Sequence, residues 1–214
     1  MPRLLTVPAL FATLALAAGC GSADTNAPPS AQVSAPGTTG ASRPGLKPAE
    51  LVLQLSDVGY GYISAASGSK PVSLPDELKM DGQPATKAAD RAGFVGGYTR
   101  FFVDGAKDVI LPVALLYKPG PYATTVISDL TFIHRVARAW HGSPTTLPAT
   151  APGTHRHLFS GFTQQDGSTV AAYLYFWQNG TVLNDLVLVG PHASANRLLT
   201  LAKKQNQRQT RLGL

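Results

Sequence analysis

Three Asp-Gly or Asn-Gly pairs lie between apolar runs in this chain, and they constrain its fold more than any other feature. The pairs are Asp104-Gly105, Asp166-Gly167 and Asn179-Gly180. Such dipeptides favour the tight turns of β-hairpins, and strands that a tight hairpin joins must run antiparallel. The sequence therefore predicts an antiparallel sheet whose main strands cover 94–103, 109–117, 157–164, 169–178 and 181–189.

Two longer segments carry the spacing of amphipathic helices. Apolar residues recur every three or four positions in 123–140 and again after residue 195: Ala123, Val126, Ile127, Leu130, Ile133, Ala137 and Trp140, then Ala195, Leu198, Leu199 and Ala202. Shorter helices are predicted at 48–55 and 85–91, and a Pro/Thr loop at 142–156. Two long helices need a sheet face to cover, so the predicted fold class is α+β, a two-layer sandwich with an antiparallel sheet covered by two long helices.

The single cysteine, Cys20, follows an apolar run at positions 4–18 and the small residues Ala17, Ala18 and Gly19. This pattern is typical of a lipoprotein signal peptide, 1–19, with a diacylglycerol joined to the Cys20 thiol. The alternative is ordinary secretion with Cys20 left as a free thiol. Lipidation explains better why an exported chain carries one unpaired cysteine.

Segment 20–45 is rich in Pro, Ser, Thr and Ala and has no aromatic residue, so we expect a disordered tether that reaches roughly 25–30 Å. Residues 46–214 have the length of a single α+β domain. Without Arg3 the mature chain has 17 basic and 12 acidic side chains, a mild excess that favours anionic lipid headgroups or cell-wall polymers. Nucleic acid is not an expected partner of an exported chain.

Several stretches resemble a known family. They are the proline-rich tether, Leu55-Ser56-Asp57-Val58-Gly59-Tyr60, Gly96-Gly97-Tyr98-Thr99-Arg100-Phe101, and Trp177-Gln178-Asn179-Gly180. Together they are similar to uncharacterised actinobacterial lipoproteins and to extracytoplasmic sensor domains of bacterial receptor kinases. The kinase domains often carry disulfides, which this chain lacks. The resemblance implies a binding or sensing role at the cell envelope.

Residues able to perform chemistry are few and scattered. His155 and His157 could face one metal ion from a strand, but a solvated His-X-His at a loop border is the simpler interpretation. His134, Arg138 and His141 form a basic stripe that is read either as a solvated helix flank or as a phosphate site. Ser160 has no flanking nucleophile-elbow motif. No catalytic, cofactor-binding or metal-binding residue is assigned, and no cofactor is expected.

These observations predict a protein at the extracytoplasmic face of the cell membrane, held there by a lipid on Cys20. Its domain is expected to be non-catalytic and to bind or sense a ligand, with a lipid or other apolar molecule in a cavity between helices and sheet. The alternative is an adaptor for an envelope protein, with an exposed aromatic patch at Tyr173, Tyr175 and Trp177. A hydrolase is the least favoured reading. The same aromatic residues are read more simply as plain core.

Overall fold

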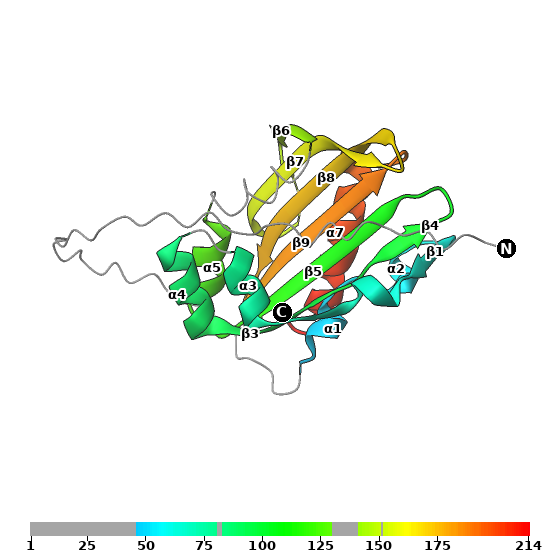
Figure 1. The fold of residues 1–214 in the computed structure, drawn as a ribbon. Helices are drawn as coiled ribbons and strands as arrows, with labels where there is room; N and C mark the ends of the chain where they lie inside the picture. Colours follow the sequence, from blue (N-terminus) through cyan, green and yellow to red (C-terminus); the bar gives the residue numbers. More distant parts are fainter. Residues whose placement is uncertain (1–45, 81–82, 130–140, 151) are drawn as a thin grey trace. The chain divides into compact units, whose positions relative to one another are not determined.

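The computed structural model describes residues 46–80, 83–129, 141–150 and 152–214, all of which belong to one compact unit, Thr38–Leu214 (Figure 1). The predicted signal peptide, Cys20, the predicted tether and residues 130–140 lie outside the described residues. No described helix is long and apolar enough to cross a membrane.

An antiparallel sheet of nine strands dominates the described part of the chain, as the hairpin pairs predict. Its main path runs β1-β4-β5-β9-β8-β7-β6, and β2 extends it through β3, which also pairs with β5. The strands are β1 (Tyr62–Ser64), β2 (Lys70–Val72), β3 (Phe94–Thr99), β4 (Phe102–Asp104), β5 (Val109–Tyr117), β6 (His141–Leu147), β7 (Thr154–Gln165), β8 (Ser168–Asn179) and β9 (Val182–Gly190).

Both later hairpins have two-residue turns, and the first of them is the predicted Asp166-Gly167. Asp166 and Gly167 join β7 to β8 with φ angles of 49° and 80°, the positive values that a turn matching the twist of the strands requires. In the β8–β9 hairpin Asn179 pairs with Val182, so the turn is Gly180-Thr181, one residue later than expected.

Three predicted elements differ from the structure. The expected loop 142–156 contains β6, an edge strand, where Pro144 is tolerated because an edge needs fewer backbone donors. The expected strand 94–103 is split into β3 and β4 opposite Pro112, which has no N–H to continue the ladder. The expected helix 48–55 is two single turns, α1 (Pro48–Leu51) and α2 (Leu55–Val58), separated by extended residues.

Helices cover both faces of the sheet, so the two-layer arrangement is wrong. On β8, Tyr175 and Trp177 pack with α7 (Ala195–Arg211), whereas Leu174 and Phe176, which alternate with them, belong to the core under α4 (Pro84–Gly93) and α5 (Tyr122–Ile127). Alternate residues of a strand point to opposite faces, so β8 contributes to two cores. The remaining short helices are η1 (Ala66–Gly68) and α3 (Leu74–Met80). The predicted second long helix is not confirmed, because α5 ends at Ile127 and residues 130–140 are not described.

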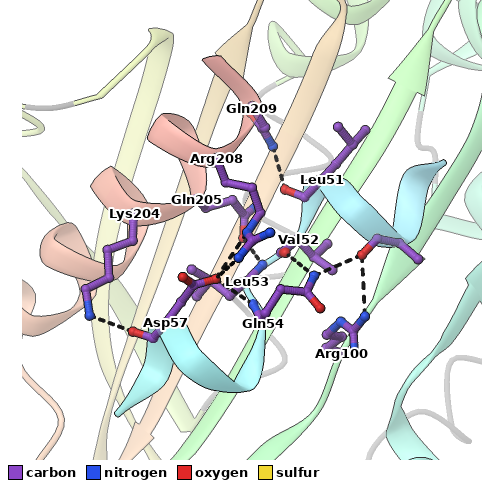
Figure 2. A network of polar contacts seen from close by, with 11 residues as sticks. Leu51, Val52, Leu53, Gln54, Asp57, Arg100, Lys204, Gln205, Arg208 and Gln209 are labelled. Carbon is purple, nitrogen blue, oxygen red and sulfur yellow. Dashed lines mark hydrogen bonds and ion pairs between the residues drawn. The ribbon is translucent and has the colours of Figure 1, made fainter. Parts of the chain in front are cut away.

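Buried amides on α7 hold the end of α1 and the extended segment that follows it. Gln209 donates to the Leu51 carbonyl at 3.0 Å, and Gln205 accepts from the Leu53 N–H at 3.3 Å (Figure 2). Both amides also donate to Asn184 on β9, at 2.6 and 2.9 Å. These bonds replace the helical bonds that the segment does not make, which explains why it is extended.

Candidate functional site

The sequence candidates for metal binding and for an aromatic surface do not form sites. His155 and His157 are separated by an irregularity of β7, with His155 exposed at a φ of 47°, and no group of three potential metal ligands occurs within the described ranges. Tyr175 and Trp177 are fully buried, with rings stacked 5.0 Å apart, and Tyr173 packs partly buried against the same core. The reading of these rings as core is confirmed. His134 and Arg138 lie outside the described residues, as does the side chain of His141.

The structure instead aligns three polar residues in one row across the α4/α5 face of the sheet. The pairing register runs Thr99 on β3, Val113 on β5, Asp185 on β9, Phe176 on β8 and His157 on β7. Thr99 and Asp185 are two strands apart, which places their Cα atoms about 9.5 Å from each other. We call these five residues the polar row.

Two atoms of the polar row are buried and have no hydrogen-bond partner among the described residues, namely Thr99 Oγ1 and Asp185 Oδ1. Buried polar atoms are nearly always satisfied, and each unmade bond costs about 1–3 kcal/mol. Burial raises the pKa of the Asp185 carboxyl to about 8, because it disfavours the ionised form. At neutral pH the carboxyl is therefore mostly protonated, and it can both donate and accept a hydrogen bond.

Apolar side chains surround the polar row on the same face. Leu111 and Val187 form the next pair along β5 and β9, and Val109 and Val189 form the pair after that. All four are only half-buried, as is Val113 within the row. On the other side of the row, Leu115 and Leu183 belong to the core that α4 and α5 cover. The row thus lies where the covered part of this face meets a half-buried apolar part.

The sequence contained a signal for this site. Asp185 is the one charged residue of β9, and strand alternation places it on the same face as Leu183, Val187 and Val189. A carboxylate at such a position is expensive unless a partner satisfies it. Thr99 has no comparable signal, because its unpaired hydroxyl follows from the pairing of β3 with β5.

A second feature of this side is an open recess of about 610 Å³ between α4 and α5. Its lining is rich in hydroxyl and carboxyl groups, among them Thr86, Thr124, Ser128 and Asp129. The Thr86 hydroxyl donates to Asp129 Oδ2 at 2.7 Å, so these two groups already satisfy each other. The recess is therefore a weaker candidate than the polar row.

A cluster around Asp108 is the nearest approach to a catalytic arrangement in the described chain. The buried Asp108 carboxylate accepts hydrogen bonds from the Arg197 guanidinium and the His192 backbone N–H, and His192 Nδ1 lies 3.5 Å away. Arg197 also donates to the Tyr62 hydroxyl, and burial raises the pKa of Tyr62 to about 12. Ser194 caps α7 by accepting from the Arg197 N–H. These groups fix the β4–β5 turn to the start of α7, which favours a structural role over hydrolysis.

Comparisons with known proteins add a limited finding. No family model matches this chain, and no curated protein matches it in sequence. A solved structure is similar. It is the extracellular domain of PknH from Mycobacterium tuberculosis, with 11% sequence identity and a TM-score of 0.40, and the match covers 75% of this chain and 93% of that chain. A similarity of this size carries no argument about function, and the site must be judged on its own chemistry.

Proposed function

We propose that this domain is a non-catalytic binding or sensing module of the cell envelope, and that its ligand is an apolar molecule with a hydrogen-bonding head group. The observation that carries the proposal is the pair of unsatisfied buried atoms, Thr99 Oγ1 and Asp185 Oδ1, on one face of the sheet. A hydroxyl, amide or amine of a ligand at the polar row would satisfy them. The half-buried side chains of Leu111, Val187 and Val189 would contact its apolar part.

The protonated state of Asp185 narrows the chemistry of this ligand. A neutral carboxyl can exchange two hydrogen bonds with an amide or a carboxylic acid, whereas an amine would pull the pKa down and bind as an ion pair. Thr99, about 9.5 Å away on the same face, can both donate and accept. A molecule with one polar end and a second polar group near this spacing would use both residues.

The test is native mass spectrometry of the full chain isolated from a bacterial envelope, with organic extraction of any bound molecule. The expected result is a discrete bound mass at a ratio of one per chain. Thr99→Val and Asp185→Leu should each weaken its retention about 10-fold, the usual worth of one or two hydrogen bonds. Thr169→Val, which removes an exposed hydroxyl on β8, is the matched control and should retain the ligand. A chain without any bound mass, or equal retention in all three variants, would contradict the proposal.

The proposed place of action is the outer face of the cell membrane, with Cys20 as the lipidated residue. The position of Cys20 after a short apolar run supports this part. Mass spectrometry of the N-terminal peptide should find Cys20 at the mature terminus with a diacylglycerol attached. Cys20→Ala should move the chain out of the membrane fraction. An unmodified thiol at Cys20 in the native protein would reject the anchor while leaving the ligand site open.

A further inference from the structure

The outer surface of α7 is strongly basic. Its 17 residues include five Lys or Arg and no Asp or Glu. Arg197 and Arg208 are half-buried and pair with Asp108 and Asp57. The other three cations, Lys203, Lys204 and Arg211, are exposed and make no ion pair with any described residue.

A fully exposed aromatic residue lies in the turn after α2, the short helix that is bonded to α7. Tyr60, at the turn between α2 and β1, is 108% exposed, and its neighbours Gly59 and Gly61 have φ angles of 105° and 91°. The glycines supply positive φ values that other residues rarely adopt, and their surroundings are open. Leu55, at the start of α2, is 47% exposed. Tyrosine with a free ring and hydroxyl is well suited to the boundary between lipid and water.

Direct bonds fix this turn to the basic helix. Lys204 Nζ donates to the Asp57 carbonyl at 2.6 Å, and Arg208 donates twice to the Asp57 carboxylate, at 2.8 and 3.1 Å (Figure 2). Tyr60 follows Asp57 by three residues, so it projects from a turn that α7 itself holds. The apolar and basic groups therefore belong to one side of the domain.

The chain also enters the domain on this side. Leu46, the first described residue, packs in the same core cluster as Leu212 and Leu214, which follow α7. Cys20 precedes Leu46 by 26 residues, a length that spans roughly 25–30 Å as a flexible coil. A lipid on Cys20 would hold this side of the domain near the membrane, and this clause rests on the anchor proposed above.

We infer that this side of the domain docks on a bilayer that contains anionic phospholipids. We call it the docking face and define it by Leu55, Tyr60, Lys203, Lys204 and Arg211. Each basic side chain close to an anionic bilayer adds its own attraction. Three cations therefore raise the affinity of the domain for the bilayer on the order of 100-fold. A low affinity of the docking face for the bilayer is sufficient, because the tether already keeps the domain close to the membrane.

Glu50 is the exposed acidic residue of the segment from Leu46 to Tyr60, and its charge opposes the attraction to an anionic bilayer. The exposed cation of Lys47, three positions earlier, compensates for it. The net sign of the docking face therefore stays positive. Tyr60 and Leu55 add apolar contact at the headgroup level, which gives a reason for an aromatic ring that is fully exposed after α2.

The test measures the depth of nitroxide labels on vesicles. The full chain carries Cys20→Ser, which removes its single thiol, and a label is attached at Tyr60→Cys or at Ala88→Cys, an exposed position of α4. Vesicles contain either about 30% phosphatidylglycerol in phosphatidylcholine or phosphatidylcholine alone. The expected result is that label 60 becomes accessible to oxygen and shielded from a water-soluble nickel complex on anionic vesicles only. Label 88 should stay exposed to nickel. Because both labelled chains share the same N-terminal apolar segment, a difference between the two labels does not depend on insertion of that segment.

Two charge variants complete the design. Lys203→Ala with Arg211→Ala should lower the docked fraction roughly 30-fold, and so should high salt. The matched control, Lys79→Ala with Arg91→Ala, removes the same charge from α3 and α4 and should dock normally. Equal accessibility of labels 60 and 88, shielding on neutral vesicles, or equal docking of the two double variants would overturn the inference. None of these outcomes depends on whether the polar row binds a ligand.

Discussion

The unsatisfied carboxyl of Asp185 makes the stability of the fold depend on pH in a defined direction. Its pKa is raised to about 8 in the folded chain, against about 3.9 in an unfolded chain. Between these values the folded state keeps a proton that the unfolded state has released. The free energy of unfolding must therefore fall as pH rises through this window, with a slope of up to about 1.4 kcal/mol per pH unit.

Asp185→Asn removes this titration and keeps the size of the side chain. Between about pH 5 and pH 7 the titration of Asp185 should lower the free energy of unfolding of the wild type by about 3 kcal/mol, because both pH values lie inside the window. The variant should be about as stable as the wild type at pH 4 and more stable by up to about 4 kcal/mol at pH 7. The slope inside the window does not depend on the exact pKa of Asp185 in the folded chain. Only the upper pH limit of the window depends on it.

Urea titrations at several pH values, followed by far-ultraviolet circular dichroism, measure this difference. The quantity to compare is the free energy of unfolding of wild type minus variant, since other groups titrate equally in both chains. Asp166→Asn is the control, because it removes a carboxylate at an exposed turn outside the polar row and keeps Asp185 in place. Parallel pH profiles of wild type and Asp185→Asn would refute the reasoning.

Three further substitutions test how the described domain is held together. Gln209→Ala removes bonds that tie α7 to β9 and to the end of α1, and it should lower the free energy of unfolding in urea by about 3 kcal/mol. The control Gln207→Ala, at an exposed position of α7, should change it little. Similar values for both variants would contradict the role of the buried amides. Asp108→Ala leaves the half-buried guanidinium of Arg197 without its carboxylate, and it should lower the free energy of unfolding in urea by about 3 kcal/mol. A loss below about 1 kcal/mol would show that the cluster does not stabilise the contact between the β4–β5 turn and α7. Gly190 has a φ of 142°, and a Cβ added there would lie 2.2 Å from a carboxylate oxygen of Asp108. Gly190→Ala should therefore lower the thermal midpoint by an amount equivalent to about 3 kcal/mol. A Cβ added at Gly105 meets nothing within 4 Å, so Gly105→Ala should melt like the wild type.

The fold was predictable where local patterns decide the structure. Strand β5 has the predicted bounds, 109–117, and the Asp166-Gly167 turn has the positive φ values that such pairs favour. The segment after α1 was not predictable as extended, because the backbone groups of Leu51 and Leu53 bond to Gln209 and Gln205, which are more than 150 positions away. The edge strand β6 was missed because its proline and threonines suit a loop equally well.

The candidate site divides in the same way. Asp185 could have been noticed as a charge within an apolar strand, but its lack of a partner depends on which residues β5 and β8 place beside it. Tyr175 and Trp177 alternate along β8 as the residues of a strand should, yet alternation cannot tell an exposed face from a buried one. The burial of these rings follows from the position of α7 on that face.

By itself, the sequence determined the antiparallel class, the positions of β5, β8 and β9 to within a residue, the Asp166-Gly167 turn, and the place of the single cysteine, since each depends on neighbours within a few residues. Only the tertiary structure decided that helices cover both faces, that Thr99 and Asp185 share one row, and that α2, the helix before Tyr60, is bonded to α7. Those relations join residues that are distant in the chain, and they depend on register and on which face each helix covers. Local propensity carries no information about either, so the site could be read only after the strands were paired.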